Sequence, residues 1–156
     1  SWNKRAIDVY SEYIDHENSS LQFNCRRHLI SSLQNQGVLY IQLLEIKAAI
    51  ATYLAVIKAQ VHFIGEEHPD VAKTLNALGV LYAEQKAYEE AKSSFKRALA
   101  MYRKYGVGEN DPDLLKTKES LSEVECILRD ENNIAKGASI SHNPPLNIFH
   151  IIIASE

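Results

Sequence analysis

The chain contains few residues of the kinds that build disulfide frameworks or membrane spans. Only two of its 156 residues are cysteine, Cys25 and Cys126, and two cysteines do not make the framework of a small secreted protein. Apolar runs such as Ile151–Ile153 are far shorter than the roughly 20 residues that cross a bilayer. No signal peptide is visible, but the sequence begins at Ser1 without methionine, so that absence carries no weight. We expect an intracellular, cytoplasmic protein that does not insert into membranes.

The chain also lacks a strong charge of either sign. Its 17 basic and 20 acidic residues give a net charge of −3, whereas nucleic-acid binding depends on clustered lysine and arginine. Hydrophobic residues make up 46% and charged residues 24%, which are ordinary values for a soluble domain. We therefore expect no nucleic-acid partner, and a length of 156 residues is enough for one domain with a substantial core.

Recognisable catalytic motifs are missing as well. The sequence has no glycine-rich phosphate loop, no nucleophile elbow and no His-Glu-x-x-His. Cys25 and His28 have the spacing of metal ligands on a helix, but a zinc site needs three or four converging ligands and no second pair is evident. A small apolar cysteine beside a surface histidine is the simpler interpretation. We expect no metal, no cofactor and no enzymatic activity.

What the chain does contain is an internal repeat. The tetrapeptide Gly37–Tyr40 occurs a second time, with the same four residues, as Gly79–Tyr82. The number of residues from Gly37 to Gly79 is the period of the repeat. Three further pairs have the same separation: Leu33 and Leu75, Ala49 and Ala91, Tyr53 and Phe95. An internal period of 20–50 residues indicates stacked supersecondary units rather than one closed globule.

The second copy carries a specific pattern. It reads Leu75-x2-Leu78-Gly79-x2-Tyr82, then Ala91-x3-Phe95 and Ala98, which is typical of a tetratricopeptide repeat, a pair of antiparallel helices. Glycine within a helix costs about 1 kcal/mol relative to alanine, so Gly79 makes sense where a side chain would keep two helices apart. Gly79 and Ala91 are both small, and we expect the two helices to approach closely there.

The period is longer than the usual one of about 34 residues, and the extra length predicts a long second helix. The segment from His68 to Asn76 (His-Pro-Asp-Val-Ala-Lys-Thr-Leu-Asn) resembles the repeats of the kinesin light chain family. This resemblance is strongest over residues 66–105, weaker over 19–65 and partial over 109–136. It implies a protein-interaction scaffold, in which the asparagine at the position of Asn76 would hold a peptide backbone.

The predicted fold is all-α: a solenoid of tetratricopeptide-type helical hairpins, with two full repeats flanked by partial ones, over residues 1–137. Ala6-x3-Tyr10 repeats the pattern of Ala49-x3-Tyr53, so residues 2–15 are expected to be the second helix of a partial repeat. Full repeats follow at 21–63, with helices over 21–43 and 46–63, and at 69–105. A capping partial repeat follows at 111–136, ending before Gly137.

The segment 138–156 is predicted to be a C-terminal tail. It carries several large apolar side chains: Leu146, Ile148, Phe149 and Ile151–Ile153. So much apolar surface is unfavourable in water. We expect residues 144–154 to pack against the helix predicted over 112–136 or to bind a neighbouring protein.

Candidate partner-binding residues follow from the repeat positions. With Leu75 as position four, positions two, five, nine and twelve of each first helix face the concave side, where solenoids bind extended segments. From these positions we select Lys73, Asn76, Val80 and Ala83 in the second repeat, Gln34 and Val38 in the first, and Lys116 and Glu119 in the third, where Glu123 and Cys126 continue the series. Val38 and Val80 could equally be packing residues.

Three functions remain open on the sequence. The first is a scaffold or adaptor that binds a protein or peptide segment. The second is a structural subunit buried in a large multiprotein assembly, which the short array and acidic third repeat favour. The third is an accessory module of a larger enzyme or regulator. The lysine–asparagine clamp of cochaperones that grip a C-terminal carboxylate is disfavoured, because Asn76 and Val80 occupy its places.

Overall fold

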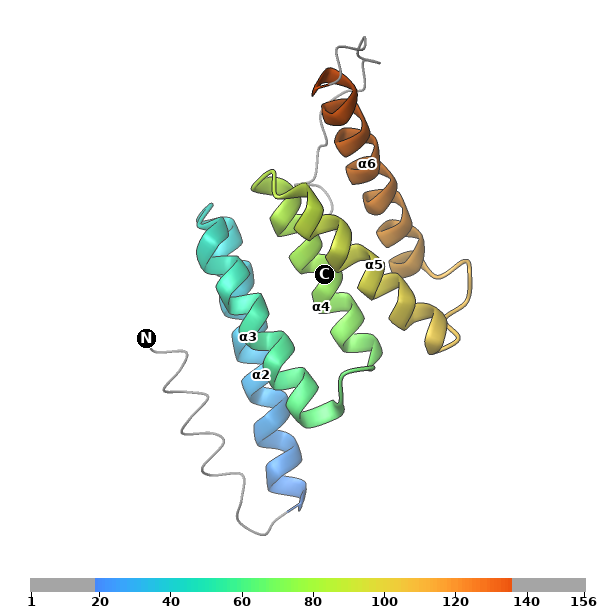
Figure 1. The fold of residues 1–156 in the computed structure, drawn as a ribbon. Coiled ribbons are helices and arrows are strands. Elements are labelled where there is room, and N and C mark those ends of the chain that lie inside the picture. Colours follow the sequence, from blue (N-terminus) through green and yellow to red (C-terminus); the bar gives the residue numbers. More distant parts are fainter. Residues whose placement is uncertain (1–18, 136–156) are drawn as a thin grey trace. The chain divides into compact units, whose positions relative to one another are not determined.

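The computed structural model describes residues 19–135, and this part of the chain contains five α-helices and no strand. The helices are α2 (Ser19–Gln42), α3 (Ile46–Ile64), α4 (Pro69–Glu84), α5 (Tyr88–Lys104) and α6 (Pro112–Ala135) (Figure 1). The all-α fold with tetratricopeptide-type hairpins is confirmed. The expected helix over 2–15, the stop at Gly137 and the tail 138–156 lie outside the described residues. The chain divides into two compact units, Ser1–Val71 and Ala72–Glu156.

In the first unit, α2 and α3 run antiparallel side by side (Figure 1). Gly37 is buried at their contact, where an added Cβ would lie only 2.6 Å from Cε2 of Tyr53. A separate apolar cluster further along the pair contains Leu29, Leu33 and Val56. The glycine therefore lets an aromatic ring of α3 lie directly on the backbone of α2.

The second unit repeats this contact between α4 and α5. An added Cβ on Gly79 would lie 2.6 Å from Cε1 of Phe95, and Ala91 is fully buried beside them. The core then extends to α6, because Val124 belongs to the same cluster as Val80, Ala83, Ala91 and Phe95. The expected close approach at Gly79 is present, and the ring of Phe95 is the group that fills it.

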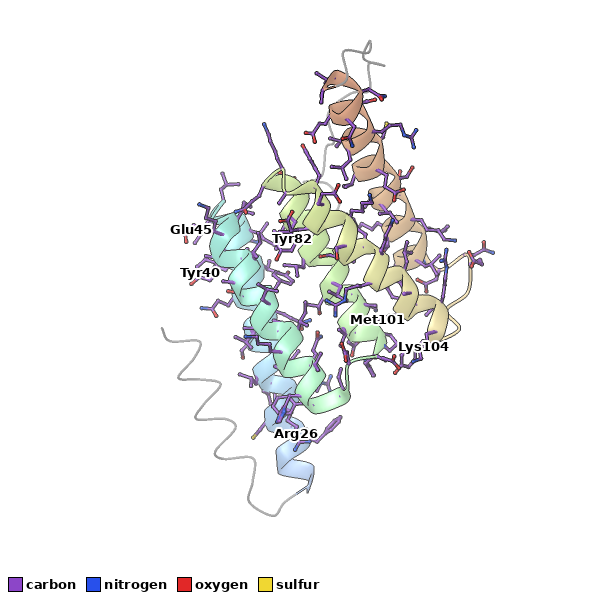
Figure 2. The ribbon with its side chains drawn as sticks, viewed as in Figure 1. Arg26, Tyr40, Glu45, Tyr82, Met101 and Lys104 are labelled. Carbon is purple, nitrogen blue, oxygen red and sulfur yellow. The ribbon has the colours of Figure 1, made fainter. Side chains whose placement is uncertain are left out.

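The two hairpin turns are built from the same backbone hydrogen bonds at equivalent repeat positions. The N–H of Glu45 donates to the carbonyl of Tyr40, and the N–H of Ala87 donates to that of Tyr82, both at 2.9 Å. Figure 2 shows Tyr40 and Glu45 together at this end of the first hairpin. The residue before each donor is left-handed, Leu44 with φ 58° and Lys86 with φ 61°, as in the Schellman motif that ends many helices.

The starts of α4 and α6 also correspond to each other. Asp111 accepts hydrogen bonds at Oδ1 from the backbone N–H groups of Asp113 (2.9 Å) and Leu114 (3.2 Å). At the equivalent place, Nδ1 of His68 accepts one from the N–H of Asp70 at 3.2 Å. Pro69 and Pro112 are the first residues of their helices, where a missing N–H leaves no carbonyl unpaired.

Candidate partner-binding face

Residues of α4 and α6 form the candidate face within the second unit. We call it the α4–α6 face and define it as Lys73, Asn76, Lys116, Glu119 and Glu123. Two observations bring these helices together. Val80 of α4 and Val124 of α6 belong to one buried cluster, and Nζ of Lys73 lies 3.3 Å from Oδ2 of Asp113.

The ion pair between Lys73 and Asp113 is open to solvent. Their side chains are 60% and 46% exposed, and exposed pairs of this kind contribute only about 0–1 kcal/mol. Lys73 and Asp113 can therefore separate at low cost, and each can pair instead with a charged group of a bound partner. The sequence did not single out Asp113, because a contact between helices of successive repeats cannot be read from either repeat alone.

Asn76 is the unusual residue of the face. Its side chain is half-buried, and its Oδ1 atom is buried without a hydrogen-bond donor from the described residues. A buried polar atom without a partner costs about 1–3 kcal/mol. The amide also offers a donor, so Asn76 can pair with both the N–H and the C=O of a peptide backbone.

The α6 side of the face is acidic. Glu119 is exposed, whereas Lys116 and Glu123 are half-buried. Burial is the main reason that the pKa of the Glu123 carboxyl is raised, and the negative charge of Glu119 raises this pKa further. Two carboxylates one helical turn apart favour a partner that brings positive charge to this helix.

The other selected residues are placed differently. Val80 and Ala83 are only 2% and 5% exposed and belong to the core cluster of the second unit. Gln34 and Val38 belong to the first unit, where both are half-buried on α2. Of the selected residues in the second unit, Lys73, Asn76, Lys116 and Glu119 are thus the ones that lie outside the core.

The described residues offer neither a metal centre nor a membrane span. Cys25 is half-buried and His28 is exposed on α2, and residues 19–135 contain no group of three or more His, Cys, Asp or Glu arranged to hold a metal ion. Within the same range, every helix is too short or too polar to cross a membrane.

Known proteins resemble this chain in sequence pattern and in fold. The tetratricopeptide repeat model matches residues 28–104, whereas none of the curated proteins matches the chain. The crystal structure of BtubC (BKLC) from P. vanneervenii has a TM-score of 0.57 and 22% sequence identity, with 93% of this chain covered. The chain spans 61% of the length of that protein. Residues 28–104 of this chain therefore match the tetratricopeptide repeat family, and the chain shares the fold of that solved structure.

Proposed function

We propose that this chain is a scaffold that binds an extended segment of a partner protein through the α4–α6 face. Tetratricopeptide repeats are generally protein-interaction scaffolds, typically without enzymatic activity of their own. The observation that carries the proposal is Asn76, because its buried Oδ1 has no donor among the described residues. Rotation of the Asn76 amide on binding would bring Oδ1 to the surface, where a backbone N–H of the bound segment would supply that donor.

The neighbouring charges suggest how the segment is oriented. Lys73 can exchange the carboxylate of Asp113 for an acidic group of the partner, since their pair is exposed. Glu119 and Glu123, further along α6, favour a basic group. The segment proposed therefore has an acidic residue near Lys73, a backbone amide at Asn76 and a basic residue beyond it.

The structural-subunit alternative has one specific observation in its favour. Leu43 and Leu44 are 59% and 68% exposed at the turn of the first hairpin, whereas the second copy has Gln85 and Lys86 there. Apolar residues at such a place are typical of a surface that another protein covers. The accessory-module alternative has no observation of its own and stays a prediction.

The test is selection of displayed peptides against the whole chain, followed by calorimetry of the selected peptides. We expect Asn76→Ala and Lys73→Ala each to weaken such a peptide by about tenfold, which corresponds to roughly 1.4 kcal/mol. Lys73→Ala should leave stability within about 0.5 kcal/mol of the parent, as is usual for surface substitutions. Asn76→Ala should not lower stability, because it removes a buried oxygen that has no donor among the described residues. Matched controls are Asn24→Ala and Lys47→Ala, which change residues of α2 and α3 outside this face.

The peptides themselves sharpen the result. Enrichment of segments with separated acidic and basic residues, and loss of affinity in Glu119→Gln, would support the proposed orientation. Peptides that bind the parent and the Asn76→Ala variant equally well would show that the α4–α6 face is not the binding site. The structural-subunit alternative would then be preferred.

A further inference from the structure

Helix α2 exposes a face that its two counterparts bury. The same three repeat positions on each first helix (three, six and ten) form what we call the receiving face. It consists of Ser32, Asn35 and Leu39 on α2, of Thr74, Ala77 and Leu81 on α4, and of Thr117, Ser120 and Val124 on α6. In each copy, the first two residues are small or polar, and the third is a larger apolar residue.

The burial of this face differs sharply between the copies. Leu81 and Val124 are 0% and 1% exposed, whereas Leu39, in the identical tetrapeptide, is 53% exposed. The smaller residues follow the same division. Thr74, Thr117 and Ser120 are buried, while Ser32 and Asn35 are exposed. The receiving face of α2 is thus the only one of the three that is left uncovered by the described residues.

The second unit shows what covers such a face. Val124 of α6 lies in one buried cluster with Ala91 and Phe95 of α5. One residue further along α6, Glu125 pairs with Lys96 of α5 at 3.2 Å. The second helix of the preceding repeat therefore lies on the receiving face of the next first helix, through its alanine and its aromatic residue. This agrees with the rule that each repeat of a solenoid contacts its neighbours.

We infer that residues 2–15 form a helix that docks on the receiving face of α2. The segment contains Ala6 and Tyr10 with the spacing of Ala91 and Phe95. The distance along the chain agrees as well, because Tyr10 precedes Leu39 by as many residues as Phe95 precedes Val124. The proposed contact thus places Ala6 and Tyr10 against Leu39, as Ala91 and Phe95 lie against Val124.

The docked segment gives the receiving face of α2 a neighbour that residues 19–135 do not supply. Covering Leu39, which is 53% exposed, removes apolar surface from water and so favours the docked state. A second copy of this chain is the other possible occupant of the face. That arrangement would make the assembly depend on concentration, whereas a segment of the same chain would not.

The single tryptophan of the chain provides the probe. Trp2 lies at the start of the proposed helix, so its fluorescence reports whether the segment is docked. In the whole chain we expect low quenching by acrylamide, high emission anisotropy and protection of amides 2–15 from hydrogen exchange. Leu39→Lys should remove all three signals, because it introduces a charge where Tyr10 would pack. Leu44→Lys is the matched control, since Leu44 is 68% exposed and off this face, and its counterpart is Lys86.

Further variants keep the inference testable if Leu39→Lys lowers the stability of the hairpin itself. Tyr10→Ser leaves α2 and α3 unchanged and should cause the same increase in Trp2 quenching. A double variant should show no further increase, because both changes break one contact. Trp2 quenching that is the same in the parent, Leu39→Lys and Tyr10→Ser would overturn the inference. So would a dimer, detected by light scattering, that Leu39→Lys dissociates, because the occupant would then be a second copy.

Discussion

The two complete hairpins share an interior and differ in their exteriors. An aromatic ring lies on a glycine in both, with the ring 2.6 Å from an added Cβ on Gly37 or on Gly79. Both turns close with the same hydrogen bonds. The outer residues diverge, since Leu44 of the first turn is replaced by Lys86 in the second. The repeat therefore preserves the contacts within a hairpin. The exposed residues of each hairpin differ, because the two hairpins have different surroundings.

One interior position also departs from the pattern and suggests that the first hairpin is the weaker one. Gln36 occupies the place of Leu78. Leu78 is 3% exposed, whereas Gln36 is half-buried. A polar amide at this position buries less apolar surface than leucine does. The first hairpin thus depends more on contacts from outside, which agrees with the docking proposed for residues 2–15.

The largest effect on stability is expected from a substitution in the interior that both hairpins share. Gly79→Leu should lower the free energy of unfolding by about 1–3 kcal/mol or more, because an overpacked side chain forces α4 and α5 apart. Even a Cβ would lie 2.6 Å from Cε1 of Phe95. Urea denaturation measures the loss. The matched control is Ala100→Leu at an exposed position of α5, which should change stability by no more than about 0.5 kcal/mol.

A second variant shows whether the ring is the cause. In a Phe95→Ala background, where the space is empty, Gly79→Leu should cost less than in the parent, because residues in contact do not act additively. Equal costs in the two backgrounds, or a Gly79→Leu variant as stable as the parent, would contradict the packing described for this hairpin.

The interior was also the part that the sequence predicted best. The repeat period correctly related Gly37 to Gly79 and Tyr53 to Phe95, because close contacts within a hairpin constrain residue size strongly. Helix boundaries were close to those observed: 46–63 was expected for the second helix, and α3 spans Ile46–Ile64. The glycine, the aromatic residue and their separation are all local in sequence, so one copy predicts the other.

The candidate face was less predictable. Position nine was placed on the concave side with packing as the open alternative, and Val80 is buried with Val124. The identity of that neighbour depends on how α6 packs, which the pattern of one repeat does not contain. The pair between Lys73 and Asp113 was missed for the same reason. Contacts between repeats depend on three-dimensional packing rather than on spacing, so they had to come from the structure.

A smaller effect should distinguish the starts of α4 and α6. Asp111→Ala should cost about 1 kcal/mol, the typical value for loss of an N-cap, because Asp111 accepts bonds from two backbone N–H groups. His68→Ala should cost less, since His68 accepts one longer bond, and His68→Asp should stabilise the protein. Thermal unfolding measures all three variants. Asn110→Ala, an exposed neighbour, is the control, and an equal cost for Asp111→Ala and Asn110→Ala would contradict the capping role.

The smallest effect concerns position nine, where the third copy has Glu123 in place of Val38 and Val80. Burial and the charge of Glu119 raise the pKa of Glu123 above 4.5, so the folded state binds this proton more tightly than the unfolded state does. Stability linked to Glu123 therefore falls as pH rises through the raised pKa and is unaffected below the unfolded value. Glu123→Gln should stabilise the protein at pH 7, by no more than about 0.5 kcal/mol, and the gain should vanish below pH 4.5.

Glu109 provides a control of opposite sign. Its hydrogen bond with Lys118, together with the charge of that lysine, lowers the pKa of the Glu109 carboxyl. Stability linked to Glu109 is then present above its unfolded pKa and is lost as pH falls through the lowered value. Thermal melts of Glu123→Gln and Glu109→Gln between pH 3 and 7 should accordingly shift in opposite directions from the parent at neutral pH. Shifts of the same sign would mean that the loss of one negative charge, rather than the surroundings of Glu123, determines the response.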